Sequence, residues 1–224
     1  MSFSSLFRDR SHAGDEMASA IATKLAQNPA SSGAAPIVYA LPKGGLPVAE
    51  PIARRLQCPL SVIVAKKITH PDNSELALGA VTADGCVLWS KRQPEDQEER
   101  RILLQPAQQK AEEQWQSFAA SCPSINPEGM LALLVDDGIA TGMTMAVALQ
   151  SLRARCPAEI WICVPVIPLE QVQSFRSYCD QLIALKAPRM FLSVGRFYQS
   201  FTQVDLPTAI SYLQMQQEWR SPSR

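Results

Sequence analysis

The chain has 224 residues, 46% of them hydrophobic, and its 21 lysine and arginine residues balance 21 aspartate and glutamate residues. This length suffices for one α/β domain with a sizeable core. The neutral balance argues against a broad attraction to nucleic acid or membrane surfaces, so any anion-binding site must be local. No apolar run is long enough to span a bilayer, and the amino terminus lacks a signal-length apolar core.

The cysteines point to a reducing compartment. The six cysteines are scattered without a CxxC pair, and the chain has only two histidines, His12 and His70. These features argue against a zinc site and favour free thiols, so we expect a cytoplasmic protein.

The first third of the chain predicts two helices that flank a strand. Residues 15–27 carry apolar side chains every four positions, which makes a core-facing stripe. After a loop rich in alanine, serine and proline, residues 37–41 are apolar and of strand length. The loop 42–47 follows, and a second helix is expected to run to about residue 56.

A second strand and a hairpin are predicted next. Residues 60–65 read as a strand, with Lys66 and Lys67 at its carboxyl end. A polar, proline-containing loop is expected over 69–75. The segments 78–82 and 86–89 flank Asp84-Gly85, a strong signal for a β-hairpin.

The second half of the chain alternates helices and strands. Residues 94–120 predict two helices or one helix kinked at Pro106. Strands are expected at 160–167 and 181–185, a helix between them, and a terminal helix over 207–219. Together with the central strand described next, this order predicts an α/β fold with a twisted, mainly parallel sheet of about five strands and helices on both faces.

The stretch 130–144 organises the chain. Residues 130–135 form an unbroken apolar run, typical of a central parallel strand, and the run ends in Asp136 and Asp137. A loop with two glycines and two threonines follows, and then an amphipathic helix. Ligands of open α/β sheets bind beyond the carboxyl ends of the strands, where a helix N-terminus suits a phosphate.

This stretch therefore offers carboxylates for hydroxyls or a metal beside a cradle for a phosphate, as a sugar phosphate requires. A P-loop would need a lysine after Gly142, and a dinucleotide fingerprint would need a third glycine. The simpler alternative is a strand-to-helix turn with Asp137 as a polar loop residue and Thr144 as N-cap.

The residues of this stretch carry a family resemblance. The segment Val135-Asp-Asp-Gly-Ile-Ala-Thr-Gly-Met-Thr144 resembles the phosphoribosyl pyrophosphate (PRPP) signature of the type I phosphoribosyltransferases. The resemblance implies that Asp136 and Asp137 engage the ribose hydroxyls. It also implies that the following loop wraps the 5′-phosphate, through Gly138, Ala140, Thr141, Gly142, Met143 and Thr144.

The resemblance extends over nearly the whole chain, to a branch of predicted phosphoribosyltransferases of unassigned substrate. It implies that Lys43, Gly44 and Gly45 form a pyrophosphate loop, although that branch has arginine where this chain has Lys43. It also implies that Lys66 and Lys67 lie against pyrophosphate. The alternatives are a glycine turn that serves geometry only and two solvated lysines.

The family further implies a small hood and a β-hairpin flap over the site. We expect one domain over 1–224, with 1–14 and 189–224 as hood or peripheral segments. The aromatic segment 191–201 is either part of the hood that receives the acceptor or a hydrophobic lid over the sheet edge. Glu75 reads as a loop anchor or as a contact of the nucleophile. Arg8 and Arg10 could reach an anionic ligand.

The implied reaction displaces pyrophosphate from C1 of PRPP by a nucleophile, usually a ring nitrogen, with Mg²⁺ bound mainly by the ligand near Asp136 and Asp137. Alternatives are a non-catalytic regulatory protein that binds PRPP or a nucleotide and, less well supported, a phosphohydrolase using the two acids. In 6-oxopurine salvage enzymes a carboxylate stands where this chain has Ala140, so we expect neither hypoxanthine nor guanine as acceptor. The acceptor and the oligomeric state stay open, and a homodimer is compatible with the sequence.

Overall fold

The computed structural model describes residues 7–27, 33–70 and 73–220, without the side chains of residues 74–76. Glu75 therefore lies outside the described side chains, and both of its suggested roles stay predictions. Within the described parts of the chain, no helix has the length and apolar character needed to cross a bilayer.

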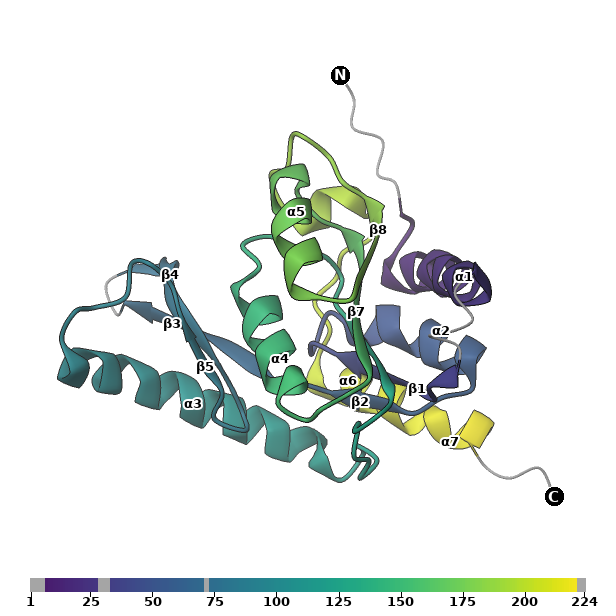
Figure 1. Ribbon diagram of the computed structural model, residues 1–224, viewed down its shortest axis with the longest axis horizontal. Coiled ribbons are helices and arrows are strands. Elements are labelled where there is room, and N and C mark those ends of the chain that lie inside the picture. Colours follow the sequence, from purple (N-terminus) through teal and green to yellow (C-terminus); the bar gives the residue numbers. More distant parts are fainter. Residues whose placement is uncertain (1–6, 28–32, 71–72, 221–224) are drawn as a thin grey trace.

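The centre of the molecule is a five-stranded, fully parallel sheet (Figure 1). Its strands lie in the order β2 (Leu60–Val62), β1 (Pro36–Ala40), β6 (Leu131–Val135), β7 (Glu159–Val166) and β8 (Gln181–Lys186). All five residues of β6 are buried, as the unbroken apolar run predicts for a strand covered on both faces. Because β6 is the middle strand, the two aspartates that follow it lie at the centre of one sheet edge.

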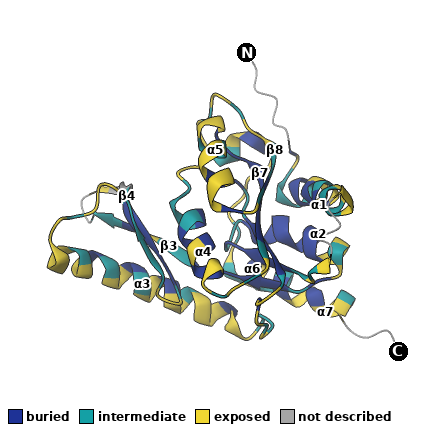
Figure 2. Ribbon diagram, in the orientation of Figure 1, coloured by how far each residue is buried: buried dark blue, intermediate teal, exposed yellow. Residues whose placement is uncertain are grey.

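Helices cover both faces of this sheet, and one hydrophobic cluster forms on each side. One cluster joins alternate residues of β1 and β6 to α1 (Arg10–Gln27) and α2 (Leu46–Leu56). The other joins the intervening residues of those strands to α4 (Met143–Arg153) and α5 (Leu169–Tyr178). Figure 2 shows the strands as a dark, buried layer between these helices. The predicted α/β fold with a five-stranded parallel sheet is confirmed.

A second, antiparallel sheet projects from the core. It consists of β3 (Ala65–His70), β4 (Asn73–Thr82) and β5 (Val87–Trp89), backed by the long helix α3 (Gln97–Ala119). We call these four elements the arm, which lies to the left in Figure 1. The predicted hairpin is β4 and β5, and α3 is a single helix with Pro106 inside it.

The arm differs from the sequence prediction at its beginning. The expected strand 60–65 ends at Val62, and Lys66 and Lys67 lie inside β3 instead of following a core strand. Much of the expected loop 69–75 is strand as well, because β3 pairs with β4. The apolar run alone could not reveal that the chain leaves one sheet for another within it.

The joint between arm and core is held by a polar cluster around Asp84, at the turn between β4 and β5. Asp84 accepts hydrogen bonds from the Thr82 hydroxyl, from Ser151 Oγ at 2.7 Å and from Arg155 Nη2 at 2.8 Å. Ser151 is in α4 and Arg155 follows it, so this carboxylate ties the arm to the helix that begins beside the acid pair.

The segment after β8 packs against Phe7, the first residue that the structure describes. Phe7 forms an isolated parallel bridge with Tyr198, which directly follows the 3₁₀ helix η2 (Val194–Phe197). The last two helices of the described residues are α6 (Leu206–Gln214) and α7 (Gln216–Arg220), and α6 packs against α2. Phe7 and Tyr198 pack in one cluster with Val166, the last residue of β7, and so lie at the edge of the sheet where the parallel strands end.

Candidate functional site

Asp136 and Asp137, which we call the acid pair, follow the central strand directly. The Asp137 amide donates a hydrogen bond of 2.8 Å to Asp136 Oδ1. Burial raises the pKa of Asp136 well above its usual range, and the adjacent Asp137 charge raises it further. Burial also raises the pKa of Asp137, although the Arg10 charge opposes that effect. The pair therefore gains from any cation or hydrogen-bond donor that a ligand brings.

Arg10, the first residue of α1, is the protein's own partner for the acid pair. Its Nε lies 2.7 Å from Asp137 Oδ2, and the two side chains are only 11% and 14% exposed. Arg10 thus makes a contact inside the protein, and the possibility that it also reaches an anionic ligand stays a prediction. Arg8, by contrast, is 68% exposed and pairs with its neighbour Asp9.

The loop that leads from the acid pair into α4 presents the beginning of that helix without a side-chain cap. Gly142 is the N-cap, with a φ of +77°, and no side chain caps the first turn. The expected alternative with Thr144 as N-cap is wrong, because Thr144 lies inside the helix. The first backbone N–H groups of a helix have no intrahelical partner, so this turn can donate to an anion.

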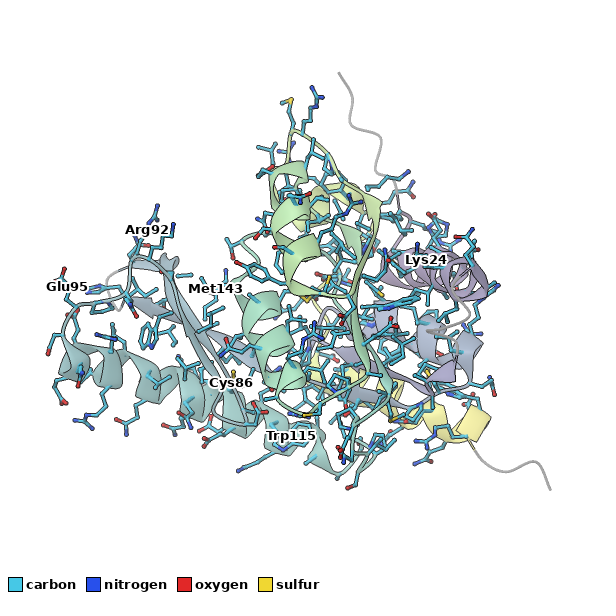
Figure 3. All side chains as sticks on the ribbon, viewed as in Figure 1. Lys24, Cys86, Arg92, Glu95, Trp115 and Met143 are labelled. Carbon is cyan, nitrogen blue, oxygen red and sulfur yellow. The ribbon has the colours of Figure 1, made fainter. Side chains whose placement is uncertain are left out.

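Helix α5 supports this loop from the outside. The Gln171 side-chain amide donates to the carbonyl of Ala140. A Cβ added at Gly142 would lie 2.8 Å from Phe175 Cζ, so both space and backbone conformation require glycine there. Met143 lies on the side of α4 that faces the arm (Figure 3). A cavity of about 760 Å³ between α4 and α5 is lined by Thr141, Gly142 and Met143 at this end.

The loop between β1 and α2, residues 42–45, contacts the acid pair. A Cβ on Gly44 would overlap the Asp137 carboxylate, so glycine is needed for the close approach. The peptide bond between Pro42 and Lys43 is cis. The structure thus brings together two predicted segments, 42–45 and 136–144, that lie far apart in the chain.

The two predicted lysines of the arm diverge. Side chains of adjacent strand residues point to opposite faces, so Lys66 shares the face of Ile68, which packs in one cluster with Leu103 and Ala107 of α3. Burial lowers the pKa of Lys66, and the charges of Lys43 and Lys110 lower it further. Lys66 is therefore within range of the charge of Lys43, which belongs to the 42–45 loop.

Lys67 is exposed on the other face of β3. It pairs with Ala80, which in turn pairs with Leu88, a residue that lines the cavity beside α4. The arm therefore presents Lys66 on the face that α3 covers and Lys67 on the face toward α4.

The aromatic segment 191–201 is packed largely on itself. The Phe7 and Tyr198 ring centroids lie 5.4 Å apart, and those of Tyr198 and Phe201 lie 5.1 Å apart. The Tyr198 hydroxyl donates a hydrogen bond of 2.6 Å to the carbonyl oxygen of Asp137. These contacts favour the packing role over direct stacking on an acceptor ring.

The donor set suits a cation shared with a ligand. Among the described residues, no group of three or more histidine, cysteine, aspartate or glutamate side chains could hold a metal ion. Magnesium is commonly bound by one or two carboxylates together with substrate phosphates and water. Asp136 and Asp137 fit that description only when a ligand supplies the remaining oxygen atoms.

Sequence reasoning missed the residues that support the site. Tyr198, Gln171 and the pairing of Arg10 with Asp137 are long-range contacts of single side chains. The sequence motifs do not indicate these long-range contacts. The one available signal was the position of Arg10 immediately before a predicted helix, which could not identify its partner.

Comparisons with known proteins agree with this geometry. The model of the phosphoribosyl transferase domain matches residues 9–194. Two Mycobacterium tuberculosis proteins, from strains CDC 1551 and H37Rv, are 36% identical over 217 residues and are both named "Putative phosphoribosyl transferase". The match covers 93% of this chain but only 46% of theirs, so the chain spans about half the length of these relatives.

A solved structure is similar over nearly the full chain. The crystal structure of the protein TT1426 from Thermus thermophilus is 32% identical, covers 95% of this chain and 98% of that chain, and superposes with a TM-score of 0.78. Since the family model covers most of the chain, this protein belongs to the phosphoribosyl transferase domain family.

Proposed function

We propose that this protein binds PRPP and transfers its 5-phosphoribosyl group to a nucleophilic acceptor, a nitrogenous base, with release of pyrophosphate. One observation carries the proposal: Asp137 lies in contact with Gly44 and directly precedes the loop to an uncapped helix N-terminus. A sugar that carries a phosphate at one end and a pyrophosphate at the other matches that arrangement.

The acid pair would bind the ribose. Asp136 Oδ1 and Asp137 Oδ2 are held by the Asp137 amide and by Arg10, which supports a fixed orientation of both carboxylates. The second oxygen of each carboxylate would accept from a ribose hydroxyl. Each such bond to a charged group is worth roughly 1.5–3 kcal/mol.

The 138–144 loop would bind the 5′-phosphate without a basic side chain. The N–H groups of the first turn of α4 and the Thr141 and Thr144 hydroxyls are the donors. A helix N-terminus also favours negative charge by roughly 0.3–1 kcal/mol. The Gln171 and Phe175 contacts keep this loop in place before the ligand arrives.

Lys43 and the 42–45 backbone would bind the pyrophosphate, together with Lys66 from the arm. The predicted contact of Lys67 with pyrophosphate is not part of this proposal, because Lys67 lies on the face of β3 toward α4. As the bond from C1 to the pyrophosphate oxygen breaks and the bond to the acceptor nitrogen forms, negative charge accumulates on the leaving group. The lysine charges would offset it. Magnesium bound with PRPP at the acid pair would supply further positive charge to that group.

The residue at position 140 limits which bases can serve as the acceptor. Ala140, where the 6-oxopurine salvage enzymes have a carboxylate, offers only a methyl group, and its carbonyl is already bonded to Gln171. The proposal therefore excludes hypoxanthine and guanine as acceptors.

The proposal also assigns the protein to the cytoplasm, which the free cysteines support.

The test is PRPP binding followed by a panel of bases. Ligand at about 100 times its dissociation constant stabilises a protein by about 2.7 kcal/mol, which for this chain length is a rise in melting temperature of roughly 5–11 °C. Pyrophosphate release with one base of the panel is the expected result. Saturable binding without release for any base would favour the regulatory alternative, and the absence of any thermal shift would overturn the proposal.

A further inference from the structure

Arg10 is surrounded by contacts that fix the direction of its guanidinium group. Nε donates to Asp137 Oδ2 at 2.7 Å, and Nη1 donates to the carbonyl oxygen of Thr202 at 2.7 Å. The guanidinium carbon lies 3.7 Å from the centroid of the Phe201 ring, a close cation–π contact. Three partners from two distant segments therefore hold this one side chain.

The same segment of the chain also fixes the backbone of Asp137. The Tyr198 hydroxyl donates to the Asp137 carbonyl, and the Tyr198 ring stacks against Phe201. Side chain and backbone of one aspartate are thus held by residues 198–202 and by the start of α1. The 42–45 loop also lies against Asp137. The missing Cβ of Gly44 in that loop leaves room for Asp137 Oδ2.

We propose that Arg10 is a positioning residue for ribose binding, which holds the Asp137 carboxylate in the one orientation that leaves its second oxygen for a ribose hydroxyl. This inference rests on the proposed binding of PRPP. A carboxylate without this partner would have to be ordered when the ligand binds, at a cost in affinity. Arg10 acts through Asp137, because its Nε group donates to Asp137 and its Nη1 group donates to Thr202.

The inference gives the packed segment 198–202 a function at the ribose. Phe201 and Tyr198 do not need to touch an acceptor in order to matter for PRPP, because they hold Arg10 and Asp137 in place. Removing the ring of Phe201 should therefore reproduce the effect of removing Arg10, to a smaller extent.

The experiment compares two ligands that differ in the ribose. PRPP and inorganic pyrophosphate, each with Mg²⁺, are titrated by calorimetry into the wild-type protein and into Arg10→Met, Arg10→Lys and Phe201→Leu. Arg8→Met is the matched control, since Arg8 lies two residues earlier and is exposed. Loss of one charge-assisted bond predicts about tenfold weaker PRPP binding for Arg10→Met.

We expect the variants to weaken the binding of PRPP, which contains ribose, but not the binding of pyrophosphate. Pyrophosphate affinity should stay within about twofold in every variant, because pyrophosphate would reach Asp137 only through a shared Mg²⁺ and does not use the oxygen assigned to the ribose hydroxyl. Arg10→Lys should recover part of the PRPP affinity, since lysine keeps the charge but not the planar fork. Phe201→Leu should lose less PRPP affinity than Arg10→Met, and Arg8→Met should bind PRPP as the wild type does.

Two results would overturn the positioning role while leaving the proposed function intact. One is wild-type PRPP affinity in Arg10→Met or, if that variant does not fold, in Phe201→Leu. The other is an equal loss of affinity for PRPP and for pyrophosphate, which would indicate that the substitution destabilises the whole site. Failure of the wild-type protein to bind PRPP is a different outcome, and it would remove the proposed function together with this inference.

Discussion

The core end of the site and the arm hold their functional side chains in different ways. At the core end, the acid pair and the 138–144 loop are fixed by Arg10, Tyr198 and Gln171, each through a direct hydrogen bond. In the arm, Lys66 and Lys67 point to opposite faces of one strand, and Lys66 has two other lysines as its charged neighbours.

This difference suggests that different parts of the site bind different parts of PRPP. The core end is assembled before a ligand arrives, whereas the charges of Lys43 and Lys110 oppose the positive charge of Lys66. Ribose and 5′-phosphate recognition would then belong to the core, and pyrophosphate recognition to the 42–45 loop together with Lys66 of the arm. The predictions below test that division with ligands that carry one part of PRPP and lack the other.

The largest effect should come from the lysines assigned to pyrophosphate. Lys43→Met/Lys66→Met should weaken PRPP binding about 100-fold, because each lysine lost removes roughly 1.5 kcal/mol or more of charge-assisted bonding. Ribose 5-phosphate, which has no pyrophosphate, should bind as in the wild type. Calorimetry of both ligands measures the contrast, and Lys24→Met on α1, remote from the arm in Figure 3, is the control. Equal losses for both ligands would contradict the division.

A smaller effect is expected at Gly142. Alanine there is strained by the φ of +77° and meets Phe175, so it should displace the loop and weaken PRPP and ribose 5-phosphate alike, by about tenfold. Gly129→Ala is a matched control, because Gly129 has a φ of +69° but nothing within 4 Å of an added Cβ. The control should lose about 1 kcal/mol of stability and no affinity. Unchanged affinity in Gly142→Ala would argue against the 5′-phosphate assignment.

The smallest effect concerns the joint between the two regions. Burial alone would raise the pKa of Asp84, but hydrogen bonds from Thr82, Arg155 and Ser151 outweigh it and lower the pKa to about 2. The unfolded chain binds the proton more tightly, so this stabilisation is present above about pH 4 and disappears as the pH falls toward about 2.

Asp84 is 41% exposed, so solvent screening reduces its contribution to about 1 kcal/mol. Asp84→Asn should therefore be less stable than the wild type by about that amount at neutral pH, with the difference vanishing near pH 2. Urea unfolding at several pH values measures it. A difference that is independent of pH would show that the charge of Asp84 is not the cause.

The parts of the structure that sequence could predict are those with a repeated local signal. The apolar run 130–135 identified the central strand, and Asp84-Gly85 identified the hairpin, because burial and turn formation each leave a pattern in adjacent residues. The order of strands and helices was sufficient for the fold class.

The parts that sequence could not predict depend on where the chain goes in space. The run 60–65 is apolar on both sides of the point where the chain passes from β2 to β3, so nothing marked the transition. Arg10 and Asp137 are brought together by the packing of α1 and the 198–202 segment, over a separation of 127 residues. Such single contacts have no periodicity that a sequence can show.

The most direct test is the thermal shift produced by PRPP with Mg²⁺ in the wild-type protein and in Asp136→Asn/Asp137→Asn. Asparagine preserves the shape of both side chains but removes the charge that a ribose hydroxyl and a cation would meet. We expect a rise of roughly 5–11 °C in the wild type, no rise in the variant, and an intact fold in both by circular dichroism. A rise of the same size in the variant would contradict the assignment of the acid pair to the ribose.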